Sequence, residues 1–154
     1  MVCASGGGQR SAYWTMNTLQ KIDSASGGGF FEHTIMFTGA SGGLIGTAYF
    51  REIKYLERKS KLRFPAYSTN YLENLGEDLL NPILYSMVVS DIFFRYQKFD
   101  YKGSQYYKGR GYAFEQKFNL NTDFVLDKSI SDYKEPEYRA EIPLLFMAPT
   151  IIND

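Results

Sequence analysis

The residue with the clearest chemical potential is a serine set among glycines. Residues Gly39-Ala40-Ser41-Gly42-Gly43 match the pattern G-x-S-x-G, which places a serine on a sharp turn between a strand and a helix and exposes its hydroxyl as a nucleophile. Gly39 and Gly43 would let the chain and a substrate approach each other closely. The alternative is that small residues only allow the turn to close, because short glycine–serine patterns also recur by chance.

A second glycine turn lies earlier in the chain, at Gly6, Gly7 and Gly8, and is followed by Gln9 and Arg10. Consecutive glycines free their backbone N–H groups to point into a cavity, which is what an oxyanion hole requires. A glycine-rich turn before a helix could instead cradle a phosphate. However, the sequence contains neither the P-loop pattern G-x-x-x-x-G-K-[ST] nor the full pattern G-x-G-x-x-G. We therefore expect Gly6, Gly7 and Gly8 to form an oxyanion hole.

The general base that would activate this serine is not evident. In an α/β-hydrolase the triad runs serine, acid, histidine along the chain, whereas the only histidine, His33, precedes Ser41. His33 stands at the entry to the strand that leads to Ser41, opposite the active edge, so we assign it a structural role. Either the base is missing from this chain or it is not a histidine. One cysteine and one histidine cannot form a zinc site.

The two glycine turns require a particular set of elements around them. We expect a short strand over residues 1–4, a helix from residue 9 or 11 to about residue 22, a loop over 24–29, a buried strand over 34–38, and a second helix after Ser41 that fades into charged residues 57–61. In the first helix, Ala12, Met16 and Leu19 share one face. Strand, glycine turn and helix thus occur twice, which is typical of a parallel sheet flanked by helices. Ligands bind at the carboxyl ends of such strands, so both turns would lie on the active edge.

Residues 62–141 carry weaker signals. Asn81-Pro82 predicts a helix start, with proline at the first helical position. The apolar segment 83–94 predicts a buried helix, or alternatively an apolar wall that admits acyl chains. Residues 95–117 interleave aromatic and basic side chains and predict a solvated loop, or alternatively a surface for single-stranded nucleic acid or anionic lipid. We expect a loop over 119–141 with at most one short strand near 124–126, and a further strand over 142–148.

The composition limits the class of protein. Of 154 residues, 44% are hydrophobic and 22% charged, which suits one domain or part of a larger one. The 17 basic and 17 acidic side chains cancel, so no global field attracts nucleic acid. Cys3 cannot form an internal disulfide, and we expect it to be buried in the first strand. Both ends look cut, and neither a signal peptide nor a spanning stretch is visible, which leaves a cytoplasmic or peripheral membrane location as the default.

Together, the turn at residues 6–10 and the turn at residues 39–43 resemble the paired motifs of the patatin-like phospholipase family. The resemblance covers residues 2–58 well, and residues 78–82, 110–115 and 143–146 look like the long bacterial members. It implies an α/β, three-layer patatin-like fold, with a mostly parallel sheet flanked by helices and incomplete in this chain. The chain would then be a partial hydrolase domain, with the two turns in residues 1–60, a helical and loop insertion over 61–141, and a further strand unit beginning at 142–154.

The resemblance also implies roles for individual residues. Ser41 matches the nucleophile of a Ser–Asp dyad, Gly6, Gly7 and Gly8 match the oxyanion turn, and Arg10 matches the basic residue that follows it. Ser11 stands where many members have glycine, a difference that we expect to affect packing more than chemistry.

The aspartate of the dyad is the main departure from the family pattern. The family places it in an Asp-Gly motif after the elbow, and no aspartate here is followed by glycine; Asp154 is last. We expect the base beyond residue 154, in which case this chain alone cannot complete catalysis.

The expected function is that of a serine lipid acyl hydrolase of the phospholipase or lipase type. The reaction that the resemblance implies needs neither a metal nor an organic cofactor. The partners would be a lipid or phospholipid substrate and a membrane surface, and no nucleic acid. The alternatives are an α/β-hydrolase esterase with a downstream histidine and a non-catalytic lipid-binding module. The particular lipid, the ester position and the oligomeric state stay open.

Overall fold

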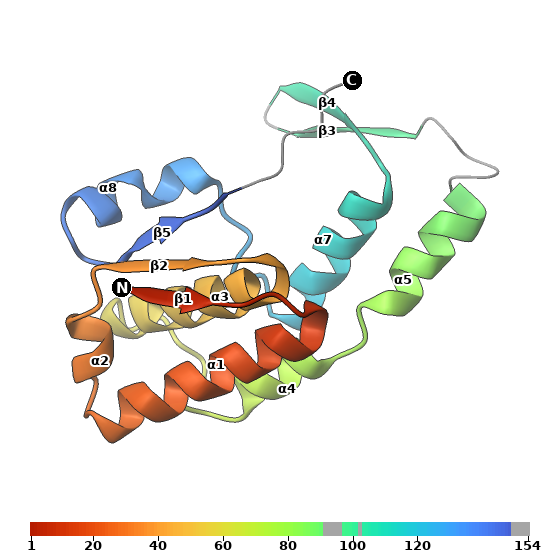
Figure 1. The fold of residues 1–154 in the computed structure, drawn as a ribbon. Coiled ribbons are helices and arrows are strands. Elements are labelled where there is room, and N and C mark those ends of the chain that lie inside the picture. The colour runs from red at the N-terminus through yellow and green to blue at the C-terminus, as the bar shows by residue number, and fades with distance from the viewer. Residues whose placement is uncertain (91–96, 102, 149–154) are drawn as a thin grey trace. The chain divides into compact units, whose positions relative to one another are not determined.

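The computed structural model describes residues 1–90, 97–101 and 103–148 (Figure 1). The chain forms two compact units. Unit 1 comprises Met1–Gly76 together with the chain from Val125 onward, and unit 2 comprises Glu77–Phe124. The structure is a mixed α/β one. No helix within the described residues is both long enough and apolar enough to cross a membrane.

Unit 1 is built on a three-stranded parallel sheet. Its strands are β1 (Val2–Ala4), β2 (Met36–Gly39) and β5 (Leu144–Phe146), in the order β1-β2-β5. Ala4 pairs with Gly39, and Thr38 pairs with Phe146. The expected parallel sheet is therefore confirmed, and the carboxyl ends of β1 and β2 lie next to each other at one edge.

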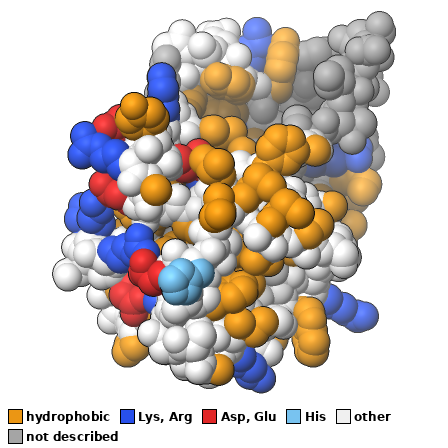
Figure 2. All heavy atoms as spheres, turned by 60° about the vertical axis from the view of Figure 1, so that its left-hand side comes forward, with side chains coloured by type: hydrophobic (Ala, Val, Ile, Leu, Met, Phe, Trp, Pro, Cys, Tyr) orange, Lys and Arg blue, Asp and Glu red, His pale blue; other side chains and the backbone are white. Residues whose placement is uncertain are grey.

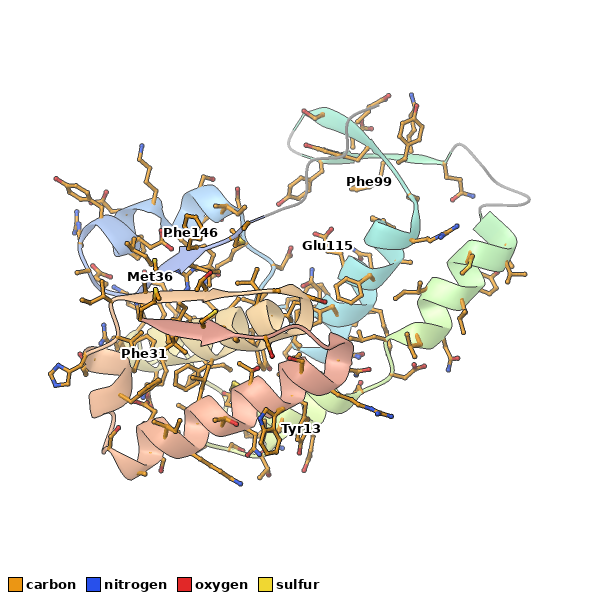
Figure 3. The ribbon with its side chains drawn as sticks, in the orientation of Figure 1. Tyr13, Phe31, Met36, Phe99, Glu115 and Phe146 are labelled. Carbon is orange, nitrogen blue, oxygen red and sulfur yellow. The ribbon has the colours of Figure 1, made fainter. Side chains whose placement is uncertain are left out.

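Two long helices follow these strands. α1 (Gly8–Ala25) comes after β1 and α3 (Ser41–Arg58) comes after β2. They pack closely against each other, and α3 packs against β2 through three aromatic rings. The ring of Phe50 lies edge-on to those of Phe31 and Phe37, with centroid distances of 5.8 Å and 6.3 Å, and all three side chains are fully buried. Figure 3 shows Phe31 among the side chains of this core.

The sequence patterns in this half of unit 1 are mostly confirmed, with shifted boundaries. Ala12, Met16 and Leu19 do share the buried face of α1. However, α1 continues to Ala25, and the short helix α2 (Gly29–Glu32) begins where a loop was expected. The predicted loop over residues 24–29 is shorter than expected, because Gly28 adopts a left-handed φ of 89° and lets α2 begin at the next residue. The prediction that Cys3 is buried is wrong, because this residue of the edge strand β1 is exposed.

The rest of unit 1 is more helical than the sequence indicated. It contains α4 (Asn70–Gly76), the 3₁₀ turn η2 (Ile130–Tyr133) and α8 (Lys134–Tyr138). No strand forms at residues 124–126, where the sequence allowed at most a short one: residues 122–126 form a turn in which Asp123 and Phe124 have positive φ values of 52° and 57°. A strand cannot contain that backbone. A capping box between Ser129 and Asp132 starts η2 instead. The strand predicted over 142–148 is confirmed only for its middle residues, as β5 (Leu144–Phe146).

Unit 2 contains α5 (Leu80–Tyr85), the π-helical turn η1 (Ser86–Ser90), the hairpin of β3 (Lys98–Tyr101) and β4 (Ser104–Tyr107), and α7 (Arg110–Asn121). A helix does start near Asn81, but α5 begins at Leu80, so Pro82 is its third residue and not the predicted first one. The buried helix predicted for 83–94 is wrong where the structure describes it, because Leu84 and Val88 are 52% and 56% exposed; residues 91–94 lie outside the described residues. The solvated loop predicted for 95–117 is wrong as well, since a hairpin and a helix occupy most of it; residues 95, 96 and 102 lie outside the described residues.

Buried polar side chains fasten the far end of α1 to α3. Asp23 is fully buried. Its carboxylate accepts hydrogen bonds from the backbone N–H of Phe31 at 2.8 Å and from the hydroxyl of Tyr67 at 2.9 Å, and it pairs with Lys54 at 3.2 Å. Burial lowers the pKa of Lys54, but its bonds to Glu57, Tyr67 and Asp23 outweigh burial and raise that pKa above the ordinary value. These residues are therefore paired and structural.

Candidate active site

Ser41 adopts a strained backbone at the junction of β2 and α3. Ala40 is extended, with φ −124° and ψ 142°, and Ser41, the first residue of α3, has a positive φ of 48°. A positive φ is uncommon outside glycine and costs on the order of 1–3 kcal/mol, and such residues cluster at functional sites. The side chain is exposed. The strand–turn–helix context that G-x-S-x-G requires is therefore present, and the turn is as sharp as a nucleophile elbow needs.

The glycines around Ser41 are required by close backbone contacts. A Cβ atom at Gly39 would lie 2.9 Å from the carbonyl oxygen of Ala4. At Gly42 it would overlap the carbonyl of Gly8, and at Gly43 the carbonyl of Ser5. The elbow therefore fits against the first glycine turn only because these positions have no side chain.

The first glycine turn lies directly beside the serine. The backbone N–H of Ala40 donates to the carbonyl oxygen of Ala4 at 3.1 Å, which continues the pairing of β1 with β2 into the turns. A Cβ atom at Gly6 would lie 3.4 Å from the Cβ of Ser41. The motifs at residues 6–10 and 39–43, with 28 residues between them in the sequence, thus meet at one edge of the sheet, as the sequence predicted.

Two glycines of that turn adopt backbone conformations that other residues avoid. Gly7 has a φ of 149° and Gly8 a φ of 62°. Gly8 is also the first residue of α1, so its N–H has no acceptor within the helix. A turn of this kind can present backbone N–H groups to an anion beside Ser41.

Ser11 has a role in this turn that the sequence did not indicate. Its Oγ donates a hydrogen bond of 2.6 Å to the carbonyl oxygen of Ser5, the residue that leads out of β1 into Gly6. The Cβ of Ser11 also lies 3.1 Å from the position that a Cβ at Gly7 would take. The side chain therefore ties the end of the turn to its beginning. The capping preference of serine near a helix start was the only signal that could have found this.

Arg10 lies on the outside of the first turn of α1. It is exposed, and within the described residues it forms no ion pair. Together with Gln9, Tyr13, Trp14 and Gly76 it lines a shallow hollow of about 330 Å³. Arg10 thus follows the first glycine turn in the sequence and faces solvent.

No general base is in place among the described residues. The Oγ of Ser41 forms no hydrogen bond to a carboxylate or to a histidine there. His33 ends α2 ahead of β2, whereas Ser41 follows the other end of that strand, and Figure 2 shows the imidazole on the surface. The described residues also include no group of three or more His, Cys, Asp or Glu side chains that could hold a metal ion.

The remaining buried charges of α3 are distant from Ser41. Arg51 binds Glu137 and the carbonyl oxygen of Pro143, and Glu52 binds Lys128. They lie ten or more residues along α3, which places them about 15 Å from Ser41. They attach the segment after residue 125 to the rest of unit 1 and take no part in the site.

Comparison of this chain with family models, curated proteins and solved structures finds no match.

Proposed function

We propose that this protein is a serine lipid acyl hydrolase of the patatin-like phospholipase type, with Ser41 as its nucleophile. The observation that carries the proposal is the positive φ of Ser41 between β2 and α3, with the Gly6–Gly8 turn packed beside it. A strained serine next to a glycine turn at the carboxyl edge of a parallel sheet is the arrangement that acyl transfer requires. The three-layer patatin-like fold and a location at a membrane surface are parts of the same proposal.

The proposed reaction proceeds in two halves. An aspartate outside the described residues takes the proton of the Ser41 hydroxyl, and Oγ attacks the ester carbonyl carbon. The C=O electrons move onto oxygen, and the oxyanion lies against the backbone N–H groups of the glycine turn. The intermediate collapses, the ester C–O bond breaks, and the leaving alcohol receives the proton from the aspartate. The same carboxylate then takes a proton from water, and the hydroxide attacks the acyl carbon. The bond from that carbon to Oγ breaks, Oγ takes the proton from the aspartic acid, and a free carboxylic acid leaves.

The glycine turn supplies most of the electrostatic part of this mechanism. One oxyanion donor contributes on the order of 3–4 kcal/mol to transition-state stabilisation. The donors are useful only if they are held in place before the substrate arrives, and the contacts of Gly42 with Gly8 and of Ser11 with Ser5 provide that fixation. Arg10 would add a positive charge near the site, suited to the phosphate of a phospholipid.

Fluorophosphonate labelling tests the proposal, because the reagent reacts only with an activated serine. The complete protein would be labelled and digested, and the adduct located by mass. Ser41→Ala is the test variant. Ser24→Ala is the matched control, since Ser24 is also an exposed serine of unit 1 and lies at the other end of α1.

We expect an adduct on Ser41 that is lost in Ser41→Ala and kept in Ser24→Ala. Release of fatty acid from phospholipid vesicles by the same preparation would then identify a lipid substrate. A folded protein that acquires no adduct would contradict the proposal and would leave a lipid-binding module without catalytic activity.

A further inference from the structure

α1 carries Trp14 on its solvent-exposed face. Ala12, Met16 and Leu19 define its buried face, and at 3.6 residues per turn Trp14 points almost directly away from that face. Its side chain is 69% exposed. A single exposed hydrophobic residue is ordinary, so the significance of Trp14 depends on the residues around it.

Two cations share the outward side of α1 with this tryptophan. Arg10 precedes Trp14 by one helical turn and Lys21 follows it by two. Both are exposed, and neither forms an ion pair within the described residues. The only acidic residue of α1, Asp23, is buried against Lys54. The exposed side of α1 therefore carries two positive charges and no negative charge.

Tyr13 extends this surface toward α4. It is 39% exposed, and its ring lies 3.8 Å from the position that a Cβ at Gly76 would occupy. In Figure 3 it projects from α1 on the side of α4. The Nε2 of Gln9 donates to the carbonyl oxygen of Leu75 at 2.9 Å, which holds the end of α4 against α1. This hydrogen bond holds Gly76, which lines the hollow beside Arg10 and Trp14, against α1.

We propose that Arg10, Tyr13, Trp14 and Lys21, here called the α1 ridge, bind the surface of an anionic lipid bilayer. Tryptophan and tyrosine prefer the interface between lipid and water because each has an apolar body and a polar group. Basic side chains near the surface of an anionic membrane are each attracted to it. The exposed side of α1 itself carries no acidic group that would oppose this attraction.

The α1 ridge lies close to the candidate active site. Gly8, at the end of the oxyanion turn, is six residues before Trp14, or about 9 Å along the helix axis. A bilayer held by the ridge would therefore bring ester groups near Ser41. The inference deepens the proposed lipid hydrolase function and rests on it for its purpose, although bilayer binding itself is measured without any reaction.

The chain contains one tryptophan, so its fluorescence reports on the ridge alone. The complete protein would be mixed with phosphatidylglycerol–phosphatidylcholine vesicles, and separately with vesicles of phosphatidylcholine only; any second tryptophan outside these residues would first be replaced by phenylalanine. With anionic vesicles we expect a blue shift of the emission and protection from acrylamide. Both effects should weaken at high salt, because screening acts on exposed charges.

Variants separate the ridge from the general surface. In co-sedimentation, Lys21→Gln should weaken binding to anionic vesicles about fivefold, and Trp14→Ser by about tenfold or more. The matched controls are Lys134→Gln and Tyr138→Ser on α8, an exposed cation and an 87% exposed aromatic of the same unit. Neither control should change binding.

Two results would overturn the inference. In one, the protein sediments with the vesicles while Trp14 stays as accessible to acrylamide as in buffer. In the other, the vesicle measurements give no support to the ridge: either the protein does not bind, or the α8 control variants weaken binding as much as the variants of the α1 ridge do. Fluorophosphonate labelling without lipid keeps the two proposals apart: labelled Ser41 with an unshifted Trp14 removes only the membrane surface, and a shifted Trp14 with unlabelled Ser41 removes only the hydrolase.

Discussion

Ser11 donates a 2.6 Å hydrogen bond from its Oγ to the carbonyl oxygen of Ser5, and so joins the two ends of the glycine turn that faces Ser41. Three glycines in succession have great conformational freedom when nothing restrains them. The bond fixes the exit of β1 relative to the first turn of α1. Ser11 therefore restrains the turn from its position in the first turn of α1.

Replacing Ser11 by alanine should slow the reaction of Ser41. Loss of one hydrogen bond of this kind costs about 1 kcal/mol, so we expect the labelling rate with fluorophosphonate to fall about fivefold. Ser11→Thr keeps the hydroxyl and should restore most of the rate. Equal rates for all three proteins would show that the turn holds its shape without this bond.

A side chain at Gly42 should destabilise unit 1, because a Cβ atom there overlaps the carbonyl of Gly8. We expect Gly42→Ala to lower the free energy of unfolding by about 1–3 kcal/mol or more. Gly29→Ala is the control: it is also a helical glycine of unit 1, and its Cβ would have only Ser26 as a neighbour, at an ordinary 3.9 Å. Urea denaturation compares the two. A Gly42→Ala protein as stable as Gly29→Ala would mean that α1 and α3 can separate easily.

Unit 1 should lose stability in alkaline solution. The pKa of Lys54 is raised in the folded state by its partners, and burial raises those of Tyr67 and Tyr133. A raised folded-state pKa contributes stability that is complete below the unfolded pKa, near 10 for both residue types, and is lost as the pH rises through the folded pKa. Urea denaturation between pH 8 and 11 should therefore show a decline from about pH 10 upward.

The share of Lys54 in this decline can be isolated. Lys54→Met should make the pH dependence shallower, whereas Lys134→Met, at an exposed position of α8, should leave it unchanged. A profile with the same slope in both variants would place the effect in the tyrosines alone.

The pH dependence of labelling should distinguish a Ser–Asp dyad from a triad with histidine. An aspartate base with a pKa near 4 stays ionised down to about pH 5, whereas a histidine with a pKa near 6.5 loses its basic form below that value. We expect labelling of Ser41 at pH 5.5 to proceed at a rate close to that at pH 7.5. A decline of about tenfold between these values would instead favour the esterase with a downstream histidine.

The sequence was informative where backbone geometry left few choices. Glycines at positions 6–8, 42 and 43 predicted two sharp turns at one edge of a parallel sheet, and the structure has Gly6 beside Ser41. The periodicity of α1 likewise predicted its buried face. These signals are local, since they depend on residues a few positions apart.

The contacts that depend on tertiary structure could not be predicted in this way. Nothing local indicates that Asp23 is buried with Lys54 and Tyr67, or that Ser11 reaches Ser5. The apolar run after Asn81 resembled a core helix, yet Leu84 and Val88 are exposed. The hydrophobicity of a segment indicates that its burial would be favourable. It does not indicate whether another element is present to cover the segment. Neither the local sequence nor the described residues identify a general base for Ser41.

The contact of Gly42 with Gly8 also has an electrostatic consequence. It brings the amino-terminal ends of α1 and α3 together, since these helices begin at Gly8 and Ser41. Each helix dipole is equivalent to roughly half a positive charge at that end, and neither first turn contains an acidic residue to neutralise it. The backbone of the two helices therefore creates a positive electrostatic potential at the edge of the sheet where Ser41 lies. This potential is present before any ligand binds, and it favours negative charge at that position.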